Sequence, residues 1–157
     1  MTQFSNVCAD VGIVDSVELY TRAGSLPASH LYAGDEIISR DAGFARVQRI
    51  STSQGRRRLV RVERGAFGNG VPHSDTLLAE DQLVHVPGPL TKSGHLANSL
   101  QCRAVDLVDA GLATHEEICD VRLVHIYCGG PKILYCNGLE IIGGDAIIPE
   151  RRRQFSR

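Results

Sequence analysis

The chain has 157 residues, a length typical of one domain. Its 17 Lys and Arg side chains balance 18 Asp and Glu side chains, and the net charge of -1 excludes a nucleic-acid binder that relies on bulk attraction to phosphate. Apolar residues make up 43% of the chain but aromatic residues only 5%, which predicts a folded, mainly aliphatic core. We expect a single domain over residues 1–149, followed by a basic tail over residues 150–157.

Apolar and polar residues alternate with a period of two over the first half of the chain, which indicates β-strands. A strand is predicted over residues 36–40, and a turn at residues 41–43 joins it to a second strand over residues 45–50. The polar residues 51–55 predict a turn, and alternation over residues 58–64 predicts the next strand.

The middle of the chain contains a glycine-rich segment. Three glycines within residues 65–72 predict a wide irregular turn, because a proline follows them where a phosphate-binding loop would need a helix. Short strands are predicted over residues 83–86 and 99–102. The pattern over residues 104–110 predicts a short helix, with Gly111 as its C-terminal cap.

The last third again predicts strands and turns. The sequence of residues 114–117 predicts a capping box around one helical turn. Strands over residues 122–127 and 132–136 predict a hairpin, and the Asn137-Gly138 pair predicts a tight turn into a strand over residues 139–142. The whole pattern indicates an all-β domain of short strands and hairpins with one short helix.

Metal, membrane and secretion signals are absent from the sequence. The N-terminal residues lack an apolar signal region, and no stretch approaches the roughly 18 apolar residues of a membrane helix. We therefore expect a cytoplasmic protein with reduced thiols, in which Cys128 and Cys136 are two buried free cysteines. The five cysteines lack CxxC spacing and the histidines lack HxH or HExxH spacing, so we expect no metal and no cofactor.

The order of several short motifs resembles the Hint domain, the autoprocessing module of hedgehog proteins and inteins, and most closely its bacterial subgroup. The motifs lie between residues 12 and 145, namely at Leu19–Gly24, Leu31–Ile37, Gly65–Pro72, Asp75–Leu78 and Val124–Gly138. The resemblance implies a β-rich, horseshoe-like fold. It also implies nucleophilic chemistry, in which an N-terminal Cys or Ser attacks the preceding carbonyl and a histidine of a T-x-x-H block assists.

The same resemblance shows where this chain departs from the family's catalytic pattern. Gly12 stands at the nucleophile position, Ala79 at the Thr position and Gln82 at the His position. Glutamine donates hydrogen bonds but does not shuttle a proton near neutral pH. His85 follows three residues later, and odd spacing along a strand predicts that it faces away from Gln82.

Other positions keep part of the pattern. His125 stands where the family often has Asp or His, and Asn137 and Gly138 match the family's A-N-G block. Ile142-Gly143 replaces the His-Asn ending of inteins, which predicts that splicing through asparagine cyclisation does not occur. A shifted alignment instead places Cys8 at the nucleophile position, although Cys8 is also readily interpreted as an ordinary thiol.

These observations leave three hypotheses. The first is a degenerate Hint-like domain that has lost autoproteolysis and serves as a structural or protein-interaction module, with a protein partner and no nucleic-acid or membrane partner. The second is an active autoprocessing domain that cleaves before Cys8 by an N–S acyl shift, with His125 as acid–base partner. The third is an anion-binding domain that uses Arg56–Arg58 and the glycine-rich turn.

Overall fold

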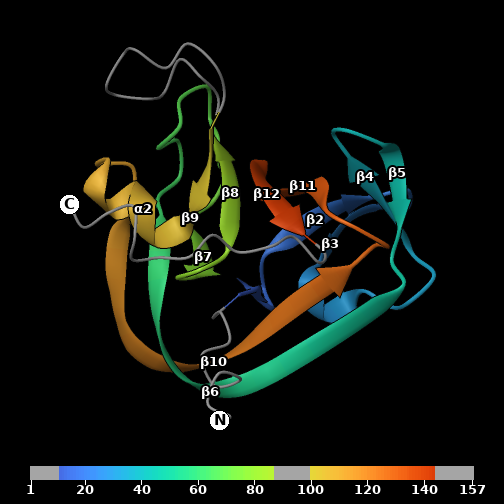
Figure 1. The fold of residues 1–157 in the computed structure, drawn as a ribbon, viewed down its shortest axis with the longest axis horizontal. Coiled ribbons are helices and arrows are strands. Elements are labelled where there is room, and N and C mark those ends of the chain that lie inside the picture. Colours follow the sequence, from blue (N-terminus) through green and yellow to red (C-terminus); the bar gives the residue numbers. More distant parts are fainter. Residues whose placement is uncertain (1–10, 87–99, 144–157) are drawn as a thin grey trace, which may run out of the picture.

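The computed structural model describes residues 11–86 and 100–143, which fold into two antiparallel sheets (Figure 1). The all-β prediction with one short helix is confirmed. Cys8 and the basic tail over residues 150–157 lie outside the described residues.

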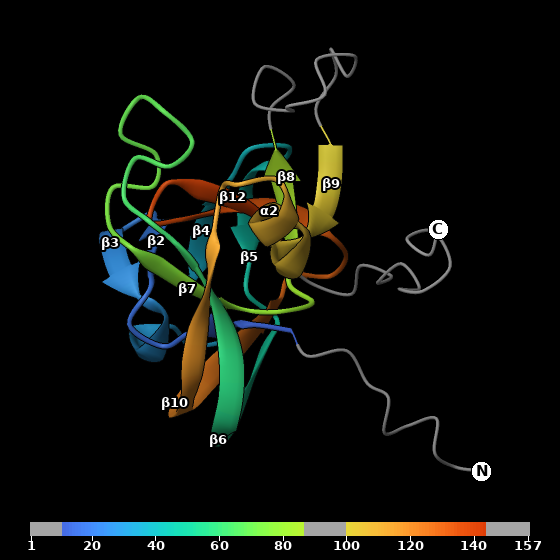
Figure 2. The same ribbon diagram turned by 90° about the vertical axis from the view of Figure 1, so that its left-hand side faces the viewer.

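The first sheet closes on itself in the order β1-β10-β6-β7. Its members are β1 (Ile13–Val14), β6 (Arg49–Val62), β7 (Thr76–Ala79) and β10 (Thr114–Tyr127). The two long strands β6 and β10 pair from Arg61 opposite Thr114 to Arg49 opposite Tyr127. They bend together through the lower part of the molecule in Figure 1 and project below it in Figure 2.

Three predictions for this sheet are wrong. Residues 51–55 continue β6 instead of forming a turn, because their backbone pairs with β10 while their polar side chains remain in solvent. Residues 114–117 begin β10 instead of a helical turn. The predicted hairpin between residues 122–127 and 132–136 does not form, since β10 pairs with β6.

The second sheet runs in the order β3-β2-β4-β11-β12-β8-β9, and β5 pairs with β4. Its members are β2 (Glu18–Thr21), β3 (Gly24–Pro27), β4 (Glu36–Ser39), β5 (Gly43–Arg46), β8 (Leu83–Val86), β9 (Leu100–Arg103), β11 (Lys132–Cys136) and β12 (Leu139–Gly143). The predicted hairpin around residues 41–43 is confirmed as β4–β5. The strand predicted over residues 45–50 is instead divided between β5 and β6.

Helical structure is short. The helix α2 (Ala104–Asp109) confirms the prediction, and Gly111 follows it with a φ of +79°, where its N–H donates to the carbonyl of Val108. A single 3-10 turn, η1, covers Ala28–His30. Among the described residues, no helix is long and apolar enough to cross a membrane.

The core is aliphatic, as the composition predicts. Its fully buried side chains come from both sheets and include Ile13, Leu19, Leu59, Leu78, Leu123 and Leu134. Cys128 and Cys136 are buried free thiols, as predicted, and burial raises the pKa of both. The two sheets thus enclose a packed interior on which the site described next depends.

Candidate functional site

Three residues that the motif order singles out meet in the interior. Gly12 precedes β1, Ala79 ends β7, and Gln82 lies in the turn before β8. The backbone N–H of Gly12 donates to the side-chain Oε1 of Gln82 at 2.9 Å. The N–H of Ala79 donates to the carbonyl of Gly12 at 3.0 Å. The fold therefore brings residues 70 positions apart into one hydrogen-bonded centre.

The turn between β7 and β8 holds Gln82 in place. Its N–H donates to the carbonyl of Ala79 at 3.1 Å, which closes the turn. Its own carbonyl accepts from the N–H of Ala104 at 2.8 Å, so Gln82 also satisfies a backbone donor at the start of α2. Gln82 is 3% exposed, so its side-chain amide would pay a desolvation cost if it lacked hydrogen-bond partners in the protein.

Both ends of the Gln82 amide are used. Its Oε1 accepts from Gly12, and its Nε2 donates to the carbonyls of Leu83 at 3.1 Å and Ile142 at 2.8 Å. These hydrogen bonds connect the segment before β1, the start of β8 and the C-terminal end of β12. A neutral imidazole has one donor and one acceptor, so a histidine at this position would leave one of these three backbone groups without its partner.

Gly12 is confined by its backbone and by its neighbours. Its φ of +126° lies in a region that L side chains rarely adopt. A Cβ atom at this position would lie 3.0 Å from the carbonyl oxygen of Val124 and 3.3 Å from the Cβ of Leu123. A nucleophilic side chain therefore does not fit at position 12 without movement of the backbone.

His125 lies on β10 near this centre. The β1–β10 register pairs Ile13 with Val124, and one further step along it sets Gly12 opposite His125. The ring of His125 is half-buried and makes an edge contact with Tyr127, with 4.5 Å between ring centroids. The fold thus places one imidazole on the strand that adjoins Gly12.

Asn137 and Gly138 form the tight turn between β11 and β12, as predicted. Their φ values of +54° and +88° suit a two-residue hairpin, and Cys136 pairs with Leu139 on either side. The Asn137 side chain is buried: its Oδ1 accepts from the N–H of Glu18 at 3.0 Å, and its Nδ2 donates to Oγ1 of Thr76 at 2.9 Å. Asn137 therefore links three segments of the fold.

His85 turns away from Gln82, as the spacing predicts. Its Nδ1 lies 2.6 Å from Oε1 of Glu140, and Arg40 approaches the same carboxylate oxygen at 3.1 Å. This ion cluster sits on β8, β12 and the end of β4, apart from Gly12. Among residues 11–86 and 100–143, no group of three or more His, Cys, Asp or Glu side chains is arranged to hold a metal ion.

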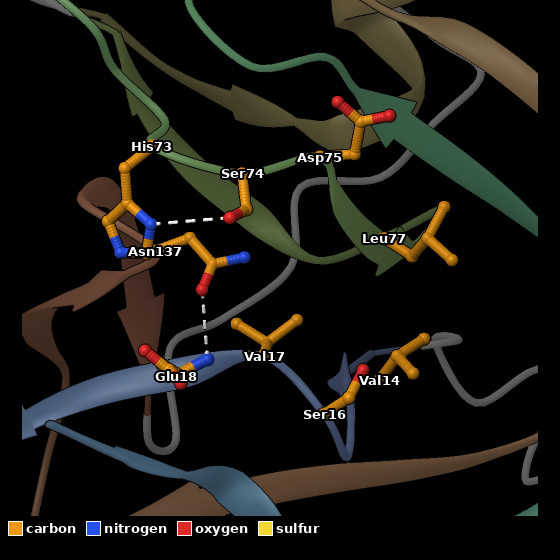
Figure 3. A pocket seen from close by; sticks show the side chains of 9 residues that line it. All are labelled: Val14, Ser16, Val17, Glu18, His73, Ser74, Asp75, Leu77 and Asn137. Atoms are coloured by element: carbon orange, nitrogen blue, oxygen red, sulfur yellow. Dashed lines mark hydrogen bonds between the residues drawn. The ribbon is translucent and has the colours of Figure 1, made fainter.

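A cavity of about 270 Å³ lies beside the β1–β2 turn (Figure 3). Its polar wall comprises Ser16, Glu18, His73, Ser74, Asp75 and Asn137. Sequence patterns do not predict this cavity, because its wall comes from three distant segments, although Asp75 and Asn137 each belong to a singled-out motif. Neither Gly12 nor Gln82 lines it, so the cavity is separate from the glutamine centre.

The negative charge of this cavity is partly neutralised. Asp75 pairs with Arg61 at 2.6 Å and accepts from the N–H of Arg64 at 2.9 Å. The Arg64 N–H and the Arg61 guanidinium hold the pKa of the Asp75 carboxyl below its usual value. Asp75 thus serves to fix the loop before β7 to β6.

Solved structures of inteins share this fold. The gp41-1 intein is 11% identical, with a TM-score of 0.52 over 87% of this chain and 100% of its own. A splice-inactive variant of the AceL NrdHF class 3 split intein is 11% identical, with a TM-score of 0.57 over 87% of this chain and 99% of its own. The MchDnaB-1 intein is 16% identical, with a TM-score of 0.51 over 84% of this chain and 99% of its own.

These identities establish the fold alone, and no curated protein matches the chain. The family comparison is more specific. The Hint domain family matches residues 14–141, which contain most of both sheets together with Ala79, Gln82 and His125. The chain therefore belongs to the Hint domain family.

Proposed function

We propose that this Hint domain has lost autoproteolysis and serves as a structural or protein-interaction module. The observation that carries the proposal is the Gln82 amide, which is buried and bonded to the backbone of three segments. An amide in this position stabilises the fold through hydrogen bonds, whereas the family's chemistry requires an acid–base group there.

Self-cleavage in this family begins with attack on a peptide carbonyl and needs a group that protonates the leaving nitrogen. Gln82 does not exchange a proton near neutral pH. Gly12 has no nucleophile, and the carbonyl oxygen of Val124 at 3.0 Å from its ideal Cβ leaves no room for one. Both requirements are therefore missing at the positions that the family resemblance assigns to them.

The alternative function is autoprocessing before Cys8. It is favoured by the position of His125 on β10, next to Val124, which pairs with Ile13. Ile13 follows Cys8 by five positions in the chain. In this mechanism the Cys8 thiol passes its proton to the His125 imidazole and the resulting thiolate attacks the carbonyl carbon of Val7. The amide nitrogen of Cys8 takes that proton back from His125 as its bond to Val7 breaks, which leaves a thioester between Val7 and the Cys8 sulfur. Gln82 has no part in this step.

Intact-mass spectrometry of the purified chain distinguishes the two functions. The proposal predicts one species of 17.1 kDa after days with added thiol. Thiol-dependent loss of the residues before Cys8, abolished by Cys8→Ala, would establish the alternative and contradict the proposal.

A further inference from the structure

One edge of β6 is only partly paired by the strands that the structure describes. Pairing with β10 occupies the opposite edge along the strand, and β7 covers the remaining edge only from Leu59 to Val62. Within the described parts of the chain, no strand pairs with this second edge over residues 50–58. The free edge of β6, as we name residues 50–58, therefore presents backbone N–H and C=O groups that no described strand pairs, along most of the strand.

The free edge is open to solvent. Ser51, Thr52, Ser53 and Gln54 are all exposed, so both faces of the ribbon are uncovered here (Figure 2). Proteins usually protect such an edge with proline, inward-pointing charge or a bulge. Residues 50–55 contain neither proline nor charge, because the arginines of the free edge stand at its far end, at positions 56–58. The β10 bulge between Glu116 and Cys119 lies opposite that same end. This segment is therefore a competent template for another strand.

Positive charge flanks the template. Arg56 and Arg58 are exposed, lie on the same face by alternation, and form no ion pair within the described residues. Arg49 stands at the other end, stacked on the ring of Tyr127 at 3.7 Å. Acidic side chains such as Asp120 lie on β10, one strand farther from the free edge. A strand added at the edge would therefore meet arginines first.

This charge disfavours a second copy of the chain as the occupant. Antiparallel two-fold pairing of two copies centred between Ser53 and Gln54 would set Arg58 of each copy against Arg49 of the other, whereas pairing centred on Gln54 would set Arg58 against Ile50 and offer it no acidic partner. Like charges opposed across a ladder are destabilising. An acidic strand would instead gain a favourable contact at each end.

We propose that the free edge of β6 binds an extended acidic peptide segment of a protein partner by strand addition. The inference rests on the proposed function as an interaction module and names its surface and the chemistry of its partner. Backbone hydrogen bonds would provide the affinity, and Arg56 and Arg58 would select acidic residues. Because these side chains are exposed, binding would weaken as salt is added.

A defined probe tests this inference with the whole chain. A nine-residue fluorescent peptide that alternates valine with glutamate is titrated, and amide shifts are followed by NMR. We expect saturable binding with the largest shifts at residues 51–57. We expect Arg56→Glu with Arg58→Glu to weaken binding by about tenfold, while Arg46→Glu on β5 changes it little.

Matched probes separate strand addition from simple charge attraction. The same peptide methylated on alternate amide nitrogens keeps its charge but cannot donate the backbone hydrogen bonds of strand pairing. We expect it not to bind. A peptide that alternates valine with lysine is expected not to bind either. Absence of saturable binding, equal binding of the lysine or methylated peptide, or shifts centred on another surface would overturn the inference.

Two other outcomes would also overturn it. Tighter binding of a ten-nucleotide oligothymidylate would assign the arginines to nucleic acid, and dimerisation through the free edge in sedimentation would assign the edge to a second copy. The mass of each sample is measured in parallel. Self-cleavage would contradict the proposed function while leaving the peptide result standing, whereas an intact chain that does not bind the peptide contradicts only this inference.

Discussion

The side-chain amide of Gln82 holds the hydrogen-bonded centre around Gly12 together, and the substitution Gln82→Ala removes this amide. The substitution deletes the acceptor for Gly12 and both donated bonds, to Leu83 and Ile142. The side chain is 3% exposed, so water does not readily replace these partners. We expect a large loss in the free energy of unfolding.

The magnitude follows from the separate groups. A buried N–H left without an acceptor costs about 1–3 kcal/mol, and each carbonyl that loses one bond costs about 1 kcal/mol. The sum, about 3–5 kcal/mol, is a large part of the roughly 5–15 kcal/mol that stabilises a typical domain. The variant is therefore expected to unfold at a clearly lower urea concentration than the wild type.

Urea denaturation followed by circular dichroism measures this loss, with Gln54→Ala as the matched control. Gln54 is exposed on β6, and its truncation is expected to change the free energy of unfolding by less than about 0.5 kcal/mol. If the two variants are equally stable, the amide contacts of Gln82 contribute nothing and the reasoning is refuted.

The substitution Gln82→Glu is expected to make the free energy of unfolding depend on pH. One oxygen keeps the Gly12 contact, but the other replaces the amide nitrogen and faces two carbonyl oxygens. Burial beside carbonyls raises the pKa of the introduced carboxyl in the folded state. The variant is therefore expected to lose stability, relative to wild type, as pH rises above the unfolded value of about 4.3. A difference from wild type that is the same at pH 4 and pH 7 would contradict this sign.

Three further predictions concern the backbone and the thiols. Gly12→Cys is expected to destabilise the fold by about 1–3 kcal/mol, because a side chain at φ +126° meets the backbone, and to produce no thiol-dependent cleavage; denaturation and intact mass measure the two effects. Asn137→Ala is expected to cost about 2–3 kcal/mol, since it breaks two hydrogen bonds in the interior. The Cys136 thiol, whose pKa is raised by complete burial, is expected to resist Ellman's reagent at pH 8 until the protein unfolds.

Each of these predictions has a control in the same chain. Gly55→Ala adds a Cβ to a glycine that meets nothing within 4 Å and lacks a positive φ, so it should be tolerated. Asn69 has the same φ of +54° as Asn137 but is exposed. Asn69→Ala therefore measures the cost of backbone strain without the loss of buried hydrogen bonds. Cys119 is partly exposed and should react before Cys136. A reversal of any of these orders would contradict the corresponding argument.

Local signals in the sequence predicted the elements that local physics determines. Asn137-Gly138 adopts the positive φ values that a two-residue hairpin requires, and the helix at residues 104–109 ends where Gly111 predicts. The order of the motifs also pointed to Gly12, Ala79 and Gln82, which the fold brings together. Whether these positions once carried the chemistry stays a prediction.

Long-range pairing was beyond the reach of these signals. Residues 51–55 carry the polar side chains of a turn, yet β10 supplies them with a ladder from more than 60 residues away. The cavity beside the β1–β2 turn depends in the same way on segments that only the folded chain brings together. The three partners of Gln82 likewise follow from tertiary contacts that no local pattern encodes.

The proposed loss of self-cleavage can be tested by trapping a thioester. A reporter domain is fused ahead of Met1, and the fusion is treated with hydroxylamine at neutral pH, which cleaves thioesters but leaves ordinary amides intact. If self-cleavage is lost, the reporter stays attached in wild type and in Cys8→Ala alike. Release of the reporter from wild type but not from Cys8→Ala would contradict it.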